Sequence, residues 1–387
     1  MTILEVTAAP FGPGREGGGE RHPTWFAAEL ARHEPVLFAY ADPGGTKGLE
    51  AGHRPIPSRY FDLPPFLTAT NPIPRLQGAS TIRSVLRENA GDIDFVHVHN
   101  LRTASATLWI LLAELRKHGD GFRVILTDHG ARFFPWPTLT ARMVDYYAPV
   151  SRFSEAILQA LAPHPSRIIP AAVSTAFTAA PPPPDWSERS IDLLFVGRVV
   201  PWKRPERLLE LAARTSERLG RSIRVVVAGA VGDRWFWDSL RERARRLAPR
   251  VAAEFWANPP DQDLIGLYRR AKIFVFASDP VDSLGRRHAA PELSSATILE
   301  AASQGTPTLA RRLPASEENI RDGVTGAIVD ALESGPALDR TVELLESPVT
   351  WSHYASAARA YVLAERTYPR IVEQFRGYLD DIRRGAV

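Results

Sequence analysis

Short β-branched apolar runs alternate with longer helical patterns along this chain, and the series starts again in the second half. Continuous apolar strands separated by amphipathic helices are typical of parallel sheets that are covered on both faces. The pattern therefore predicts an α/β protein with two doubly wound, Rossmann-like domains. In the first half the expected strands cover 3–7, 36–40, 95–99, 124–127, 148–151 and 167–170, and the expected helices cover 23–32, 106–118 and 153–161.

The second half repeats the alternation and ends in helices. Its expected strands cover 193–196, 225–228, 253–256, 273–277, 307–310 and 326–329, and the helices between them cover 205–219, 234–247, 262–271 and 294–303. No convincing strand follows Asp330, and helical patterns over 338–346, 353–365 and 371–383 finish the chain. Because ligands bind beyond the carboxyl ends of the strands in open α/β sheets, two such domains predict a central ligand cleft between them.

Four consecutive prolines at 181–184 separate the two series. Proline lacks an amide hydrogen and fixes φ, so this run suits a stiff extended connector rather than a helix or a sheet. We therefore expect a first domain over 1–180, a proline-rich linker over 181–188, a second domain over 189–350, and C-terminal helices over 351–387 that pack across both domains.

The composition excludes several classes of function. The 387 residues suit two domains, and the net charge of +3, from 47 basic and 44 acidic residues, lacks the excess of a nucleic-acid-binding protein. The absence of cysteine excludes disulfides, thiolate metal sites and thiol catalysis. The N-terminus lacks the basic segment of a signal peptide and no apolar run reaches about 18 residues, so we expect a cytoplasmic protein. The basic stretch 241–250 offers few apolar anchors for membrane contact, and the sequence leaves the oligomeric state open.

The strongest motif is Pro-Glu-Leu-Ser-Ser-Ala-Thr-Ile-Leu-Glu-Ala-Ala-Ser-Gln-Gly-Thr-Pro at 291–307. Ser294 is the expected N-cap of a helix that ends at Gly305, and the first backbone N–H groups of that helix would favour an anion. Glu292, before the helix, could reach a sugar ring, and Glu300, about a turn and a half inside, could accept from ribose hydroxyls. The alternative is a loop glutamate and a solvated helix glutamate, but the strand–loop–helix context favours the ligand site.

A second motif, Leu-Phe-Val-Gly-Arg-Val-Val-Pro-Trp-Lys-Arg-Pro at 194–205, ends a predicted strand and opens a predicted helix. Gly197 lets the backbone approach a ligand closely. Arg198 and Lys203 are two cations that could neutralise a diphosphate, because charge-assisted hydrogen bonds contribute about 1.5–3 kcal/mol each. The alternative is a basic turn that surface carboxylates hold.

Two weaker motifs lie in the first half. The glycine-rich segment 11–22, which includes Gly18 and Gly19, could wrap a phosphate or a sugar, or could be a surface loop. His129 lies in Thr-Asp-His-Gly at 127–130, at the end of a predicted strand, and is expected to face the cleft. His97 and His99 share one face of a predicted strand, but no third ligand candidate is evident, so we expect no metal site there.

In chain order, these motifs resemble the retaining nucleotide-sugar glycosyltransferases of GT-B fold, in particular glycosyltransferase family 4 (glycosyl transferases group 1). The resemblance covers nearly the whole chain and is strongest over 193–330. The matching segments are the glycine-rich loop, Thr-Asp-His-Gly, Ala-Pro-Val-Ser-Arg-Phe-Ser (148–154), Phe-Val-Gly-Arg (195–198) with Lys203, the two glutamates, Ser-Glu-Glu-Asn-Ile (316–320) and Asp-Gly-Val-Thr-Gly (322–326).

The resemblance implies a role for each matching residue. The first domain would take the acceptor and the second the nucleotide sugar, with Arg198 and Lys203 on the donor diphosphate. Glu292 would bind the transferred sugar, Glu300 the ribose, and His129 the sugar near the reacting centre. The implied catalytic residues are His129, Glu292, Arg198 and Lys203, and the implied donor-binding residues are Gly18, Gly19, Gly197, Arg198, Lys203, Glu292, Ser294, Ser295, Ala296 and Glu300.

The resemblance also implies the chemistry. The leaving phosphate would deprotonate the acceptor on the same face of the sugar, so the anomeric configuration is retained without a protein nucleophile. No metal and no cofactor is expected beyond a UDP- or GDP-sugar donor, and the acceptor would be a small molecule, a saccharide or a lipid. A nucleotide-sugar epimerase of similar fold and a non-catalytic nucleotide-sugar-binding protein are the alternatives.

The sequence departs from the family pattern around the expected sugar pocket. Ser294-Ser295 replaces the usual Phe-Gly, Leu313-Pro314-Ala315 replaces the usual Gly-Gly, and the loop over 279–290 is long. These departures leave the expected diphosphate residues intact. They leave open which sugar is transferred and to which acceptor class.

Overall fold

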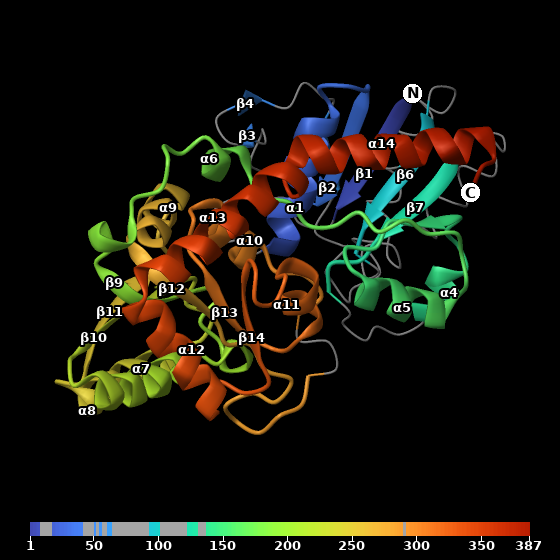
Figure 1. Ribbon diagram of the computed structural model, residues 1–387. Helices are drawn as coiled ribbons and strands as arrows, with labels where there is room; N and C mark the ends of the chain where they lie inside the picture. The colour runs from blue at the N-terminus through green and yellow to red at the C-terminus, as the bar shows by residue number, and fades with distance from the viewer. Residues whose placement is uncertain are drawn as a thin grey trace. The chain divides into compact units, whose positions relative to one another are not determined.

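The computed structural model describes residues 1–7, 18–41, 93–100, 122–130, 137–288 and 292–387, together with three short strands within 50–63 (Figure 1). Only the backbone is described for 18–21, 38–41 and those three strands. The chain divides into two compact units, Met1–Ala171 with Tyr368–Val387, and Ala172–Thr367.

The first unit is built on a six-stranded sheet in the order β5-β2-β1-β6-β7-β8, and all neighbouring pairs are parallel. Its strands are β1 (Thr2–Thr7), β2 (Val36–Ala41), β5 (Tyr60–Leu63), β6 (Ile93–His99), β7 (Arg123–Thr127) and β8 (Tyr146–Tyr147), with β3 (Glu50–Ala51) and β4 (Arg54–Pro55) paired separately. The helices are α1 (Gly18–Leu30), α4 (Pro137–Ala141), α5 (Arg152–Leu161) and α14 (Tyr368–Arg384).

Two of the strands predicted for this half are wrong, and one predicted helix, 106–118, lies outside the described residues. The strand predicted at 148–151 lies instead at Tyr146–Tyr147, and 167–170 forms no strand. Backbone hydrogen bonds do join these segments, from Arg167 N–H to Tyr147 O and from Ile169 N–H to Pro149 O. Pro149 has no N–H to return a bond, so the ladder stops there.

The second unit has a six-stranded parallel sheet in the order β11-β10-β9-β12-β13-β14. Its strands are β9 (Ile191–Val196), β10 (Ile223–Gly229), β11 (Val251–Ala257), β12 (Ala271–Phe276), β13 (Thr308–Arg311) and β14 (Gly326–Val329). Its helices are α6 (Thr175–Thr178), α7 (Glu206–Leu219), α8 (Arg234–Leu247), α9 (Asp261–Arg270), α10 (Ala296–Ser303), α11 (Pro314–Asn319), α12 (Gly335–Glu346) and α13 (Pro348–Glu365). The six strands predicted for this half are confirmed.

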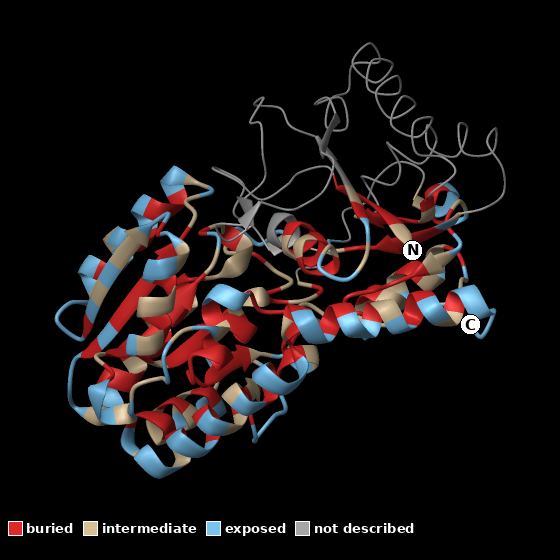
Figure 2. Cartoon of the chain, turned by 90° about the horizontal axis from the view of Figure 1, so that it is seen from above, coloured by how far each residue is buried: buried red, intermediate tan, exposed pale blue. Residues whose placement is uncertain are grey.

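This strand order places a switch point between β9 and β12. The chain proceeds from β9 outward to β10 and β11, then returns to β12 on the other side of β9. Ligands of doubly wound sheets bind beyond the carboxyl ends of the strands at such a point. Figure 2 shows the strands of both units largely buried and the outward faces of the helices exposed.

The proline-rich segment lies against the second unit. Val173 N–H donates to Arg366 O at 2.8 Å, Gln304 Nε2 donates to Phe177 O at 2.6 Å, and the Arg269 guanidinium donates to Pro181 O and Pro182 O. The division therefore falls after Ala171, whereas we predicted a domain end at residue 180 and a linker over 181–188. It falls again after Thr367, so α13 belongs to the second unit and α14 to the first.

A close backbone approach at the ends of β9 and β10 leads to a first prediction. Gly229 has φ +141°, and a Cβ atom at this position would stand 1.9 Å from the Gly197 carbonyl oxygen. We expect Gly229→Ala to lower the free energy of unfolding by at least about 2 kcal/mol. Gly266→Ala on α9, where a Cβ meets nothing within 4 Å, is the control, expected to stabilise by up to about 1 kcal/mol. Equal urea midpoints for the two variants would contradict the prediction.

In the part of the chain that the structure describes, no helix has both the length and the apolar character that crossing a bilayer requires.

Candidate functional site

The structure brings Lys203 and Glu292 together, although 89 residues separate them in the sequence. Lys203 ends a 3-10 turn, Pro201–Lys203, that follows β9, and its Nζ donates to Glu292 Oε1. Ser278, just beyond β12, donates its Oγ hydrogen to the same carboxylate oxygen at 3.1 Å. The side chains of Lys203 and Glu292 are 16 % and 10 % exposed. A cation and a carboxylate thus meet at the switch point between β9 and β12.

The surroundings of Lys203 perturb its ionisation. Burial lowers the pKa of Lys203 to about 7, and the positive charge of Arg198 adds to this effect. The adjacent Glu292 carboxylate favours the charged form of the amine. Arg198 itself is exposed. An anion that binds here would therefore meet the exposed guanidinium of Arg198 and the largely buried amine of Lys203, which pairs with the Glu292 carboxylate.

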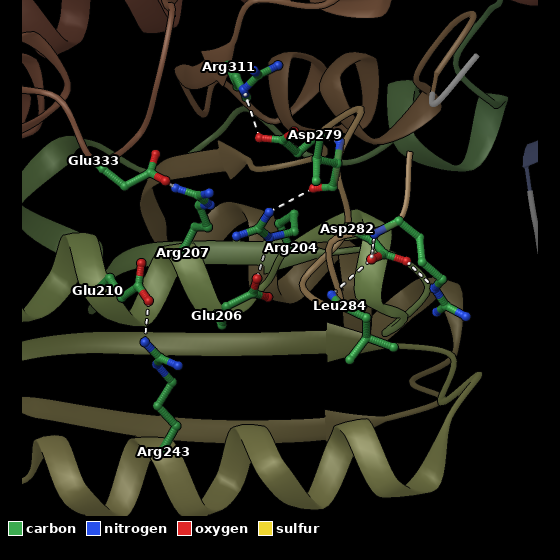
Figure 3. Close-up of polar contacts among 12 residues, drawn as sticks. Arg204, Glu206, Arg207, Glu210, Arg243, Asp279, Asp282, Leu284, Arg311 and Glu333 are labelled. Atoms are coloured by element: carbon green, nitrogen blue, oxygen red, sulfur yellow. Dashed lines mark hydrogen bonds and ion pairs between the residues drawn. The ribbon is translucent and has the colours of Figure 1, made fainter. Parts of the chain in front are cut away.

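The long segment between β12 and Glu292 is tied to the turn that bears Lys203. Asp279 N–H donates to Trp202 O at 3.2 Å, and Ser283 N–H donates to Pro201 O at 3.3 Å. In Figure 3, Arg204 reaches across to this segment, and its Nη1 donates to Val281 O at 2.7 Å. These bonds hold residues 279–283 against the turn that bears Lys203.

Two acidic residues hold the inside of the same segment. Asp279 pairs with Arg311 of β13 at 3.0 Å, and Asp282 accepts from the backbone N–H groups of Leu284 and Arg286 (Figure 3). Burial opposes the charge of Asp282, but hydrogen bonds from Arg286, His288 and Leu284 outweigh it and lower its pKa to about 2. Residues 279–288, the described part of the long loop, are therefore held by specific ion pairs and hydrogen bonds.

Helix α10 begins one residue later than predicted. Its N-cap is Ser295, not Ser294, and its first helical residue is Ala296. Ser295 has an extended backbone, and its Oγ pairs with Thr297 Oγ1 at 3.0 Å instead of capping a backbone N–H. Leu293, two residues before this N-cap, is buried. The N–H groups that the helix leaves for a ligand therefore start at Ala296.

Glu300 lies in the middle of α10 and is buried. The hydroxyl of Tyr268, which is also buried, donates to Glu300 Oε2 at 3.0 Å. The phenol thereby fixes one oxygen of the carboxylate. Binding of ribose by Glu300 stays a prediction.

The first unit holds a buried cluster of histidines around one glutamate. Glu5 on β1 stands beside His97 in the register of β1 and β6. His97 Nδ1 lies 3.0 Å from Glu5 Oε1, His99 Nε2 lies 2.8 Å from Glu5 Oε2, and His99 Nδ1 lies 3.0 Å from His129 Nε2. His129, the residue predicted to contact the sugar, is thereby connected to the core.

The sequence reasoning missed Glu5. No third ligand candidate was evident beside His97 and His99, and the structure supplies one. The available signal was a lone acidic residue inside the otherwise apolar strand Thr2–Thr7. The three side chains form a candidate metal-binding group. However, ligands of tetrahedral zinc at about 2.1 Å stand about 3.4 Å apart, whereas these atoms lie 2.8–3.0 Å apart, which suits direct hydrogen bonds better.

Burial disfavours the charged form of three histidines here, His22, His99 and His129. It lowers the pKa of His22 to about 3 and that of His99 to about 4, and it lowers the pKa of His129 well below the ordinary value. For Glu5, burial raises the pKa, but the charges and hydrogen bonds of His97 and His99 prevail and lower it to about 2. At neutral pH, His22, His99 and His129 are therefore uncharged.

These shifts predict acid-sensitive folding of the first unit. Because His22 and His99 have folded pKa values below 6.5, the unfolded chain binds more protons, and stability falls as pH drops from 6.5 towards 4. Each histidine contributes about 1.4 kcal/mol per pH unit over that range. Glu5 adds a loss only below about pH 4.5. Urea unfolding at pH 7.5 and pH 5 measures the effect, and equal stabilities at the two pH values would contradict it.

The remaining predicted residues are distributed between the units. Gly18 and Gly19 open α1, so they lie in a helix rather than in the predicted loop, and residues 8–17 lie outside the described residues. Gly197, Arg198 and the start of α10 belong to the second unit with Lys203 and Glu292. His129, Gly18 and Gly19 belong to the first.

Two Rossmann-like parallel-sheet units with C-terminal helices define a glycosyltransferase fold, the GT-B fold. The Anabaena protein Alr3699/HepE, solved in complex with UDP and glucose, matches with a TM-score of 0.72 and 16 % identity over 98 % of this chain and 100 % of its own. Sucrose-phosphate synthase from Thermosynechococcus elongatus matches with a TM-score of 0.71 and 17 % identity over 100 % of each chain. These likenesses confirm the predicted fold.

Two family models match successive parts of the chain. The model for Glycosyltransferase Family 4 matches residues 16–177, and the model for glycosyl transferases group 1 matches residues 177–360. The chain therefore belongs to glycosyltransferase family 4.

Curated relatives share part of the sequence. D-inositol 3-phosphate glycosyltransferase from Corynebacterium urealyticum is 28 % identical over 47 % of this chain and 42 % of its own length. D-inositol 3-phosphate glycosyltransferase 2 from Catenulispora acidiphila is 33 % identical over 40 % of this chain and 35 % of its own. The chain thus spans less than half the length of these relatives.

Proposed function

We propose that the chain transfers a sugar from a nucleotide-diphosphate sugar to an acceptor hydroxyl, with retention of anomeric configuration and without a metal. The pair of Lys203 and Glu292 carries the proposal. It sets a cation and a carboxylate side by side beyond β9 and β12, where doubly wound sheets bind ligands. A diphosphate needs the first group, and the hydroxyls of a sugar need the second.

The chemistry follows from these groups. Lys203 and Arg198 hold the diphosphate and neutralise the charge that grows on its leaving oxygen. Glu292 accepts a hydrogen bond from a hydroxyl of the transferred sugar. The acceptor oxygen bonds to the anomeric carbon as the carbon–phosphate-oxygen bond breaks, and the acceptor's proton passes to the leaving phosphate oxygen on the same face. Two cationic side chains supply the charge that a metal would otherwise supply.

The donor and the acceptor are proposed by class. The complex of the Anabaena neighbour with UDP supports a UDP-sugar, with a GDP-sugar as the other choice. The names of the curated relatives add a phosphorylated cyclitol to the acceptor classes of small molecules, saccharides and lipids.

A thermal-shift screen of UDP-, GDP-, ADP- and TDP-sugars, followed by transfer assays with EDTA, tests the function. We expect one nucleotide class to stabilise the chain, EDTA to leave transfer intact, and proton NMR of the product to show the donor's anomeric configuration. Inversion would contradict the mechanism. Epimerisation of the sugar without an acceptor would favour an isomerase, and binding without turnover would favour a binding protein.

The pKa of Lys203 predicts proton uptake on ligand binding. Because that pKa is about 7, the amine is largely neutral at pH 8, and a bound diphosphate should restore its proton. We expect uptake of about half to one proton per nucleoside diphosphate at pH 8 and less at pH 6. Calorimetry in two buffers of different ionisation enthalpy measures the uptake. A binding enthalpy that does not depend on the buffer would contradict this expectation.

A further inference from the structure

A continuous chain of hydrogen bonds runs through the buried cluster of the first unit. It passes from the Ala148 carbonyl through Thr127 and His97 to Glu5, and from Glu5 through His99 to His129. Each link measures between 2.7 and 3.0 Å. Glu5, His97 and His99 are at most 2 % exposed, and His129 at the end of the chain is partly exposed.

The hydrogen atoms in this series of hydrogen bonds can be placed by starting from the Ala148 carbonyl, which can only accept. Thr127 Oγ1 donates to the Ala148 carbonyl, which cannot donate in return, so Thr127 must accept from His97 Nε2. His97 therefore uses Nε2 to donate to Thr127 and presents Nδ1 to Glu5 Oε1. The other carboxylate oxygen of Glu5 faces His99.

The same reasoning extends along the hydrogen bonds from Glu5 through His99 to His129. The contact between His97 Nδ1 and Glu5 Oε1 holds one hydrogen, whichever of the two atoms carries it. Glu5 Oε2 is therefore an acceptor, and His99 Nε2 must donate to it. Uncharged His99 then has no hydrogen on Nδ1, and His129 Nε2 must donate to that atom. Since His129 is uncharged as well, its Nδ1 carries only a lone pair.

We propose that Glu5, acting through His99, is a positioning residue that fixes the tautomer of His129 with the hydrogen on Nε2, so that Nδ1 accepts a hydrogen bond from a sugar hydroxyl. The hydrogen bond from a sugar hydroxyl rests on the proposed function, whereas the tautomer of His129 does not. The His129 backbone N–H donates to Asn100 Oδ1 at 3.1 Å and fixes the residue from the other side. His22 of α1 stacks at a tilt 4.8 Å from the His129 ring, and its pKa is lowered too, so it brings no charge.

The tautomer determines what His129 can select. A neutral imidazole nitrogen that carries no hydrogen can accept a hydrogen bond from a hydroxyl. It has no hydrogen to donate to a carbonyl or a phosphate oxygen. The opposite tautomer would donate from Nδ1 and would favour those acceptors. The cluster thus makes this position selective for a hydroxyl of the substrate.

Long-range proton–nitrogen correlation spectra of the full chain with ¹⁵N-labelled histidine test the tautomer directly. The resonances are assigned with His129→Gln, and exposed His353→Gln in the other unit serves as the control. We expect a protonated Nε2 and a bare Nδ1 for His129 in the wild type. A protonated Nδ1 in that spectrum overturns the proposal without any variant at position 5.

Two substitutions at Glu5 separate positioning from packing. Glu5→Met removes the acceptor for His99, and we expect His129 to become a mixture of tautomers. Glu5→Gln can accept from His99 and donate to His97, so it should preserve the wild-type tautomer. A His129 tautomer that is unchanged in Glu5→Met would overturn the proposal. If that variant does not fold, His99→Met breaks the adjacent link and replaces it.

Transfer kinetics then test the substrate clause. Glu5→Met should lower kcat at least about tenfold with little change in the KM of the donor, and Glu5→Gln should restore kcat. Adding Glu5→Met to His129→Ala should cost nothing further, and an additive loss would contradict the relay. A wild type that has the expected tautomer but transfers no sugar contradicts the proposed function and leaves the positioning role of Glu5 standing.

Discussion

Replacing Lys203 with methionine is expected to weaken binding of the nucleoside diphosphate by about tenfold to a hundredfold. A charge-assisted hydrogen bond to phosphate contributes about 1.5–3 kcal/mol, and 1.4 kcal/mol corresponds to a factor of ten. Methionine keeps the length of the side chain but removes the charge. It also leaves Glu292, which is 10 % exposed, without its cation and facing an anionic ligand. Isothermal titration calorimetry with UDP and GDP measures the loss.

The chain offers a matched control for this substitution. Lys272 stands near the amino end of β12, the end opposite to the candidate site, and its Nζ lies 3.7 Å from the Trp186 ring centroid. Lys272→Met removes the same charge from the same unit and should leave the affinity unchanged. Equal affinities of Lys203→Met and the wild type would remove Lys203 from the donor site.

The framework of the second unit could be predicted because its central strands are buried on both faces. Every residue from Ile191 to Val196 is buried, so such strands appear in the sequence as continuous apolar runs. The first unit was harder where prolines interrupt pairing. Residues 148–151 have the apolar content of a strand, yet Pro149 cannot donate to a ladder. Apolar content alone does not show which backbone groups can pair.

The site was predictable as a set of residues but not as a set of contacts. Gly197, Arg198 and Lys203 follow a strand, and topology brings them to the same sheet edge as the end of β12. The direct pairing of Lys203 with Glu292 depends on how residues 277–288 fold back through Asp279 and Asp282. Loop geometry of this kind has no periodic signature. Glu5 was missed for another reason: its partners depend on strand register across 92 residues.

Replacing Glu292 with glutamine is expected to lower kcat by about a hundredfold while leaving the affinity for nucleoside diphosphate equal or slightly higher. Glutamine preserves the size of the side chain and can still accept from Ser278, so the local fold should persist. It removes the charge that strengthens a hydrogen bond from the sugar hydroxyl in the transition state. It also releases Lys203 from its partner and removes a negative charge near the diphosphate.

The opposite signs of the two effects make this variant informative. Loss of a merely structural carboxylate would weaken nucleotide binding and catalysis together, whereas loss of a sugar contact lowers kcat alone. Exposed Glu254→Gln on β11 is the matched control, with both constants unchanged. Initial rates with the sugar donor and calorimetry with the nucleoside diphosphate give the two numbers. Near-normal turnover in Glu292→Gln would exclude the carboxylate from the reaction, and the pair with Lys203 would then be part of the fold alone.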